Sequence, residues 1–112
     1  MKKVLAQSAG FTKKHQINVA TGKSLNDMAG SKIVGVTAAA IIEDADKETG
    51  EVKRVGVVVD KEGYVYSSIS EVVLESMEGV IELLEDGEDF DIGVVSRKSK
   101  GNNRDYLSLA IL

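Results

Sequence analysis

The aromatic residues whose spacing is most suggestive of chemistry are three tyrosines. Tyr64 and Tyr66 stand two positions apart in a short apolar stretch, and Tyr106 alternates with Leu107 and the apolar residues that follow it. Side chains two apart in a strand share a face at a separation of about 6.7 Å. Rings exposed at this spacing could stack on planar bases. The alternative is a half-buried ring with only its hydroxyl group at the surface.

Basic residues accompany the tyrosines, although the net charge of the chain is −4. Residues 1–42 contain six basic residues and one acid, residues 92–112 contain four basic residues and one acid, and residues 70–91 contain nine acids and no base. A fold that placed the acidic stretch on one side could present a basic groove on the other. The alternative is that these charges only solvate the surface. The candidate nucleic-acid-binding residues are Tyr64, Tyr66, Tyr106, Arg54, Arg97, Lys98, Lys100, Arg104, Lys14, Lys23 and Lys32.

The chain has few residues that are suited to catalysis or metal binding. The chain has no cysteine, and its single histidine, His15, has the pattern of a surface residue at a strand end. Four glutamates between residues 71 and 82 follow helical spacing, which favours a solvated face over a metal site. Gly22-Lys23-Ser24 lacks the earlier glycine of a phosphate-binding loop. We therefore expect no enzymatic activity, no metal and no cofactor.

The hydrophobic pattern predicts mostly strands. Apolar stretches alternate with polar turns from Ile17 onward, which is typical of an antiparallel sheet. We expect residues 1–13 to form a flexible N-terminal arm and residues 14–112 to form a single domain. The predicted strands cover residues 15–19, 32–42, 52–59, 64–67, 90–96 and 105–111.

One segment, residues 68–86, has helical periodicity. Ser68 precedes Glu71 by three positions, the spacing of a capping box. Apolar residues then recur at intervals of three and four, and the glutamates fall off that stripe. The sequence predicts one acidic amphipathic helix between the third and fourth main strands. This order favours a mainly β, OB-like antiparallel barrel or sheet of five to six strands, although a plain sheet covered by one helix would give the same order.

Several short motifs resemble the single-stranded DNA-binding proteins of small protein-primed tailed phages, the phi-twenty-nine-like group. The motifs are residues 63–70 (GYVYSSIS), the acidic helix, residues 99–102 (SKGN) and residues 106–109 (YLSL). The similarity runs from about Ile17 to the end. It implies non-specific coating and protection of displaced single-stranded DNA during phage replication. It also implies DNA contact for Tyr66 and an equivalent aromatic place for Tyr106, whereas Ile42 stands where the family has a further aromatic residue.

Two other functions stay open at this point. The acidic helix over residues 68–86 could make the chain a non-catalytic protein-interaction module, such as a phage-encoded inhibitor or adaptor. The apolar faces of residues 32–42 would also suit a homo-oligomer. If the chain binds single-stranded DNA, we expect this DNA and replication proteins to be its partners. No stretch approaches the ~18 apolar residues of a membrane span, so we expect no membrane partner and a cytoplasmic location, in a bacterial host if the chain is phage-encoded.

Overall fold

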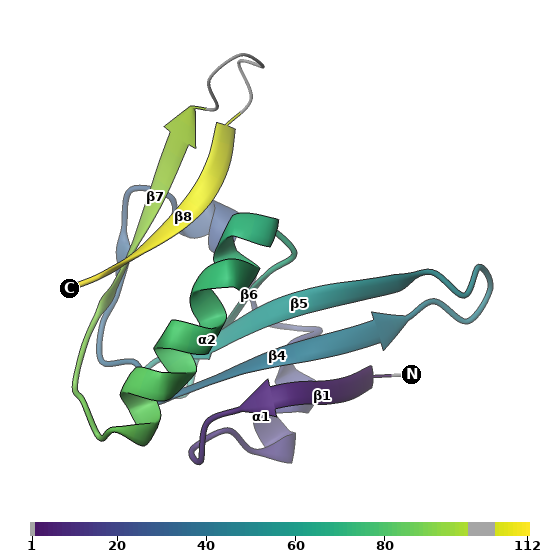
Figure 1. The fold of residues 1–112 in the computed structure, drawn as a ribbon, viewed down its shortest axis with the longest axis horizontal. Coiled ribbons are helices and arrows are strands. Elements are labelled where there is room, and N and C mark those ends of the chain that lie inside the picture. The colour runs from purple at the N-terminus through teal and green to yellow at the C-terminus, as the bar shows by residue number, and fades with distance from the viewer. Residues whose placement is uncertain (1, 99–104) are drawn as a thin grey trace.

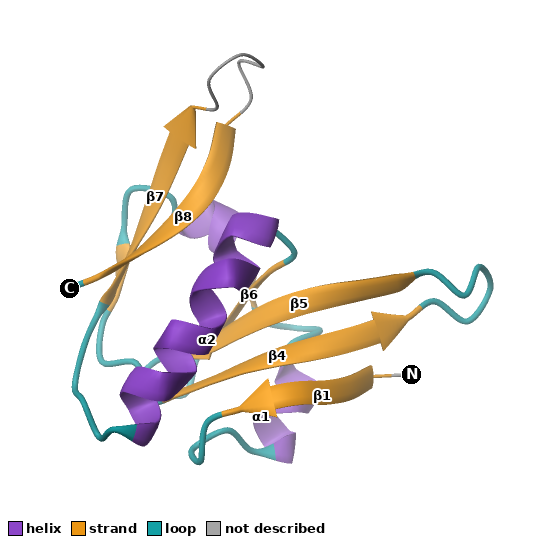
Figure 2. Ribbon diagram, in the orientation of Figure 1, coloured by secondary structure: helices purple, strands orange, loops and turns teal. Residues whose placement is uncertain are grey.

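The computed structural model describes residues 2–98 and 105–112, and within them the chain forms eight strands, two α-helices and one 3₁₀ helix (Figure 1, Figure 2). In chain order the elements are β1 (Lys2–Gln7), α1 (Lys13–Asn18), β2 (Lys23–Ser24), the 3₁₀ helix η1 (Leu25–Met28), β3 (Lys32–Ile33), β4 (Ala38–Ala45), β5 (Val52–Val59), β6 (Val65–Ser68), α2 (Glu71–Glu85), β7 (Ile92–Lys98) and β8 (Asp105–Ile111).

The larger sheet has five strands in the order β1-β4-β5-β6-β2. Neighbouring strands in this sheet are antiparallel, except that β2 pairs parallel with β6. Side chains alternate between two buried faces, as a strand covered on both sides requires. Val57 and Val59 of β5 pack in one cluster with Phe11, while Val58 packs in the other cluster with Val73 and the rest of α2. The N-terminal segment therefore covers one face of the sheet and α2 covers the other.

The smaller sheet has the order β3-β7-β8 and shares the core of α2. Four residues on one side of α2 are buried: Val73, Met77, Val80 and Ile81. A Cβ atom placed on Gly56 of β5 would stand 3.0 Å from the Met77 Cγ, so the helix lies close against the sheet at this glycine. Figure 1 shows α2 crossing β4 and β5 and continuing beside β8. The helix thus connects the two sheets through a common core.

The mainly β class with one main helix is confirmed, but the described strands form two sheets rather than one closed barrel. Strand 52–59 and helix 71–85 lie where the pattern places them. The predicted capping box is wrong in detail, because Ser70 is the N-cap of α2 and the Ser68 hydroxyl accepts a hydrogen bond from the Ser70 amide instead, at 3.0 Å. The predicted run over residues 32–42 is divided into β3 and β4, with Gly35 at φ +67° between them.

The N-terminal part of the chain differs most from the prediction. Residues 2–7 of the expected flexible arm form β1, which pairs with β4 along the edge of the larger sheet. The expected strand over residues 15–19 is wrong, since Lys13–Asn18 is helix α1. Its cap explains the difference: the Thr12 hydroxyl accepts from the His15 amide, and the His15 Nδ1 accepts from the Thr12 amide. These two bonds satisfy free donors at the helix start.

Candidate nucleic-acid interface

Tyr66 is not an outward-facing stacking residue, in contrast to the prediction. Its side chain belongs to the core shared with α2 and is 6% exposed. Its hydroxyl donates a hydrogen bond to the Asp60 Oδ2 at 3.0 Å. Burial, reinforced by this bond to a carboxylate, raises the pKa of Tyr66 to about 12. The ring is therefore largely buried, and its hydroxyl group has a buried polar partner in place of solvent.

The raised pKa of Tyr66 predicts a loss of stability at alkaline pH. Below pH 10 the phenol is neutral in the folded and unfolded states, so its contribution is intact. Between about pH 10 and the folded-state pKa of about 12, the unfolded chain loses its proton first, so the free energy of unfolding falls by on the order of 2 kcal/mol. Urea unfolding from pH 9 to 12 should show a smaller fall for Tyr66→Phe. An equal fall in both proteins would contradict this assignment.

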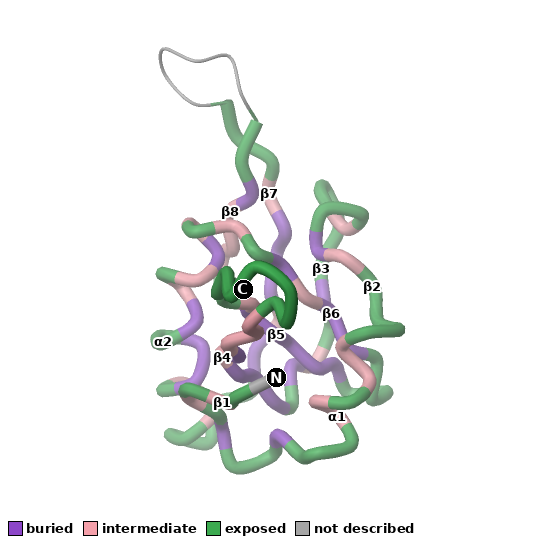
Figure 3. Tube along the Cα trace, turned by 90° about the vertical axis from the view of Figure 1, so that its right-hand side faces the viewer, coloured by how far each residue is buried: buried purple, intermediate pink, exposed green. Residues whose placement is uncertain are grey.

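The other two tyrosines are exposed. Tyr64, with 58% of its surface exposed, ends the turn between β5 and β6, while Tyr106 of β8 is 36% exposed. In the β7–β8 register, Tyr106 stands directly opposite Arg97. Residues directly opposite in an antiparallel pair project from the same face. An exposed ring and an exposed guanidinium group therefore share one face of this hairpin. Figure 3 shows that the backbone of β7 and β8 is exposed toward this end of the hairpin.

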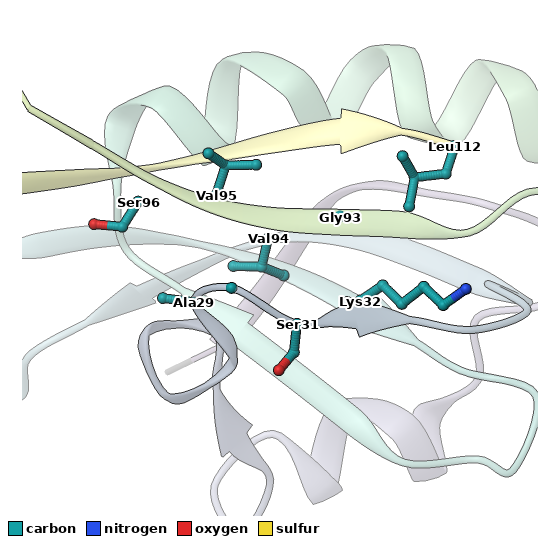
Figure 4. A pocket seen from close by; sticks show the side chains of 9 residues that line it. Ala29, Ser31, Lys32, Gly93, Val94, Val95, Ser96 and Leu112 are labelled. Atoms are coloured by element: carbon teal, nitrogen blue, oxygen red, sulfur yellow. The ribbon is translucent and has the colours of Figure 1, made fainter.

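Beyond Tyr106, the same face of the hairpin carries small side chains. Gly93 pairs with Ala110, and Val95 pairs with Ser108. An open hollow of about 810 Å³ borders this strip (Figure 4). The residues lining it are Ala29, Gly30, Ser31, Lys32, Gly93, Val94, Val95, Ser96 and Leu112. At the Gly93 end the Leu112 side chain covers the strip, and Val95 and Ser108 are only partly buried.

Two further hollows adjoin the first. One of about 300 Å³ is lined by Lys32, Lys61 and Tyr66 together with the acids Asp60 and Glu62, and one of about 390 Å³ is lined by Lys61 and Leu112 together with Asp89 and Asp91. Lys32 lines the first and second hollows and Lys61 lines the second and third, so the three are neighbours on the same part of the surface. We call this region, with the neighbouring exposed side chains, the β3–β7 surface. It comprises Lys32, Lys61, Val95, Arg97 and Tyr106, together with Tyr64, the exposed residue that ends the turn carrying Lys61.

The structure brings some predicted basic residues to this surface. The Lys32 side chain is 60% exposed, with its Nζ 3.9 Å from the Asp91 Oδ2. Such an exposed ion pair is weak and leaves the ammonium group available to a phosphate. Arg97 and Lys98 are exposed at the end of β7. Lys61 belongs to the surface but was missed, because a lysine in a turn beside two acids gave no signal.

Other predicted basic residues lie elsewhere. Lys14 is on α1, and Lys23 on β2 lies opposite Tyr66 in the parallel register. Arg54 lines two hollows beside α2 with the acids Glu43, Glu71, Glu75 and Glu78. These hollows share no lining residue with those around Lys32. Arg54 is thus separated from the β3–β7 surface and surrounded by carboxylates. Lys100 and Arg104 lie outside the described residues.

The Gly-Lys-Ser sequence has a structural explanation. A Cβ atom on Gly22 would stand 2.5 Å from the Val65 backbone oxygen, so only glycine lets β2 approach β6 this closely. The Ser24 hydroxyl accepts from the Asn26 amide and caps η1. Among the described residues, no group of three or more His, Asp or Glu side chains is placed to hold a metal ion. None of the described helices combines the length and the apolar character needed to cross a membrane.

Comparisons with known proteins identify one family. Searches of curated proteins and of solved structures found no match. A family model described as phage single-stranded DNA-binding protein, of the phi-twenty-nine group, matches residues 7–112. The match covers most of the chain and includes the tyrosines, β3, β7 and β8. The chain therefore belongs to the family of phage single-stranded DNA-binding proteins.

Proposed function

We propose that the chain binds single-stranded DNA without sequence preference along the β3–β7 surface, and so coats and protects the strand displaced during phage replication. We place the DNA on this surface because Tyr106 pairs with Arg97 on one exposed face. A ring can stack on any base, and a guanidinium group can bind any phosphate, so the pair binds DNA of any sequence.

The surroundings of this pair support an extended ligand. Tyr64 offers a second exposed ring, and Lys32 and Lys61 offer cations next to the same hollows. Ser96 of β7 is exposed beside the largest of these hollows, whereas the Leu112 side chain covers Gly93 at the other end of the strand. The DNA contacts then consist of stacking and phosphate binding, with no catalytic step and no cofactor.

Further parts of the proposal concern the setting of this activity. We propose that the fold is related to the OB-fold, because its one main helix, α2, follows β6 and precedes the β7–β8 hairpin. DNA replication of a phage takes place in the bacterial cytoplasm, where replication proteins and further copies of the chain would be its partners.

Salt dependence tests the proposed phosphate contacts. For single strands, the slope of log K against log salt concentration is about −0.7 per neutralised phosphate. Lys32→Ala and Arg97→Ala should each reduce the steepness of this slope by about 0.7. Lys47→Ala is the matched control, because Lys47 lies in the turn between β4 and β5, which projects away from β7 and β8 (Figure 1).

The measurement is a titration of tyrosine fluorescence with oligo-dT at several salt concentrations between about 50 and 200 mM. A slope that Lys47→Ala changes as much as Arg97→Ala would reject the placement of the phosphates. If the folded chain does not bind oligo-dT at any salt concentration, DNA binding itself is rejected. That result would favour helix 68–86 as a protein-binding element.

A further inference from the structure

Asp60 is the centre of a hydrogen-bond network that fixes the turn between β5 and β6. The residue is 8% exposed. Its Oδ1 accepts from the amides of Glu62 and Tyr64, both at 2.9 Å, and its Oδ2 accepts from the Tyr66 hydroxyl at 3.0 Å. Three strong donors therefore satisfy this buried carboxylate, as a buried charge requires.

The backbone of Asp60 closes the same turn. Its amide donates to the Tyr64 carbonyl at 3.1 Å, and its carbonyl accepts from the Gly63 amide at 3.0 Å and from the Thr37 hydroxyl at 3.1 Å. Gly63 has a φ of +86°, a conformation that suits glycine at no steric cost. The backbone and carboxylate of Asp60 together hold residues 60–64 in one conformation.

This turn carries two members of the β3–β7 surface. Tyr64 at its end is exposed, and Lys61 near its start lines two of the hollows. A Cβ atom on Gly35 would stand 3.0–3.3 Å from three carbon atoms of the Lys61 side chain, so the lysine stem lies directly on the Gly35 backbone. The lysine stem is thus packed in place, and the backbone that carries the Tyr64 ring is fixed.

We propose that Asp60 is a positioning residue for single-stranded DNA, anchored by the buried Tyr66. This proposal rests on the proposed function. Asp60 touches no DNA; it fixes the turn that presents Tyr64 and Lys61 before the strand arrives. A preorganised contact loses less conformational freedom on binding, which strengthens the complex. Tyr66 contributes to binding through its hydroxyl and Asp60, not through stacking.

Substitutions at Asp60 test the proposal by titration with oligo-dT. Asp60→Ala should weaken binding about five- to tenfold, because the tyrosine contact is no longer held in place. Asp60→Asn should stay within about twofold of wild type, since its amide oxygen can accept from both backbone amides and its amide group can donate to the Tyr66 oxygen. Tyr66→Phe, which removes only one bond, should weaken binding about two- to threefold.

A double-mutant cycle separates positioning from general destabilisation. In a Tyr64→Ala background, Asp60→Ala and Tyr66→Phe should each change the affinity less than twofold, because the ring that they position is gone. Val80→Ala is the structural control: it removes buried atoms from α2 and lowers stability, and the folded variant should keep its affinity.

Different results would overturn the positioning role of Asp60 and the proposed function. If Asp60→Ala or Tyr66→Phe weakens binding equally with and without Tyr64, or leaves the affinity unchanged in a folded protein, the positioning role is overturned. If wild-type protein shows no salt-dependent binding of oligo-dT, the proposed function itself fails. Loss of the Asp60→Ala effect in the Tyr64→Ala background would support the proposal.

Discussion

Replacing Tyr64 and Tyr106 together by alanine should lower the affinity for oligo-dT about 30-fold or more. Base–aromatic stacking contributes about 1–3 kcal/mol per ring, so two lost rings cost at least about 2 kcal/mol. Both side chains are exposed, at 58% and 36%, so their removal leaves the core intact. The measurement is competition of each variant for labelled oligo-dT at one fixed salt concentration, after circular dichroism has confirmed folding.

Ile69→Ala is the matched control for this double variant. Ile69 is a large apolar residue that is 64% exposed, and it lines the acidic hollow next to Arg54. Its removal should leave the affinity for oligo-dT within about twofold of wild type, because it lies away from the β3–β7 surface. Wild-type affinity in the folded Tyr64, Tyr106 double variant would rule out these two rings as the stacking surface.

Met77→Ala should destabilise the fold by about 3 kcal/mol. Met77 is fully buried, and its side chain lies against Gly56 of β5 where α2 meets the larger sheet. Truncating a buried methionine typically costs 2–5 kcal/mol, because the lost contacts leave a cavity that relaxes only in part. Urea denaturation followed by far-ultraviolet circular dichroism measures the change in the free energy of unfolding.

Glu78→Ala, one position further along the same helix, is exposed and should change that free energy by no more than about 0.5 kcal/mol. A loss below about 1 kcal/mol for Met77→Ala would contradict the close packing of α2 on β5. A large loss for both variants would indicate that the helix itself, rather than its buried side, limits stability.

The parts of the fold that the sequence predicts best are those with long periodic patterns. Helix α2 shows a clear stripe at intervals of three and four, and β5 alternates through Val55, Val57 and Val59. Short elements carry too few residues for a period. Strand β1 has only three consecutive apolar residues, and its place depends on pairing with the distant β4. The alternating pattern in the segment of helix α1 is also typical of a strand. The signal for the helix was the Thr12 and His15 capping pair, with histidine in place of the usual glutamate or glutamine.

The site was predictable in composition but not in arrangement. Tyr64 and Tyr66 share a face only if both lie in a regular strand, whereas β6 begins at Val65, after Tyr64. The hydrogen bond from Tyr66 to Asp60 joins residues that no local pattern connects. Arg54 shares its strand face with Gly56 and Val58, as its parity predicts. The local pattern does not show that α2 covers this face. The tertiary packing of α2 on the sheet places Arg54 among carboxylates.

Amide chemical shifts of the labelled protein, recorded by NMR with and without oligo-dT, test the location of the DNA most directly. We expect the largest changes at residues 30–34, 61–64, 93–97 and 106–110. The exposed side of α2 and the turn at residues 46–50 should change little. Changes concentrated on α2 and around Arg54, with none along β7 and β8, would contradict the placement of single-stranded DNA on the β3–β7 surface.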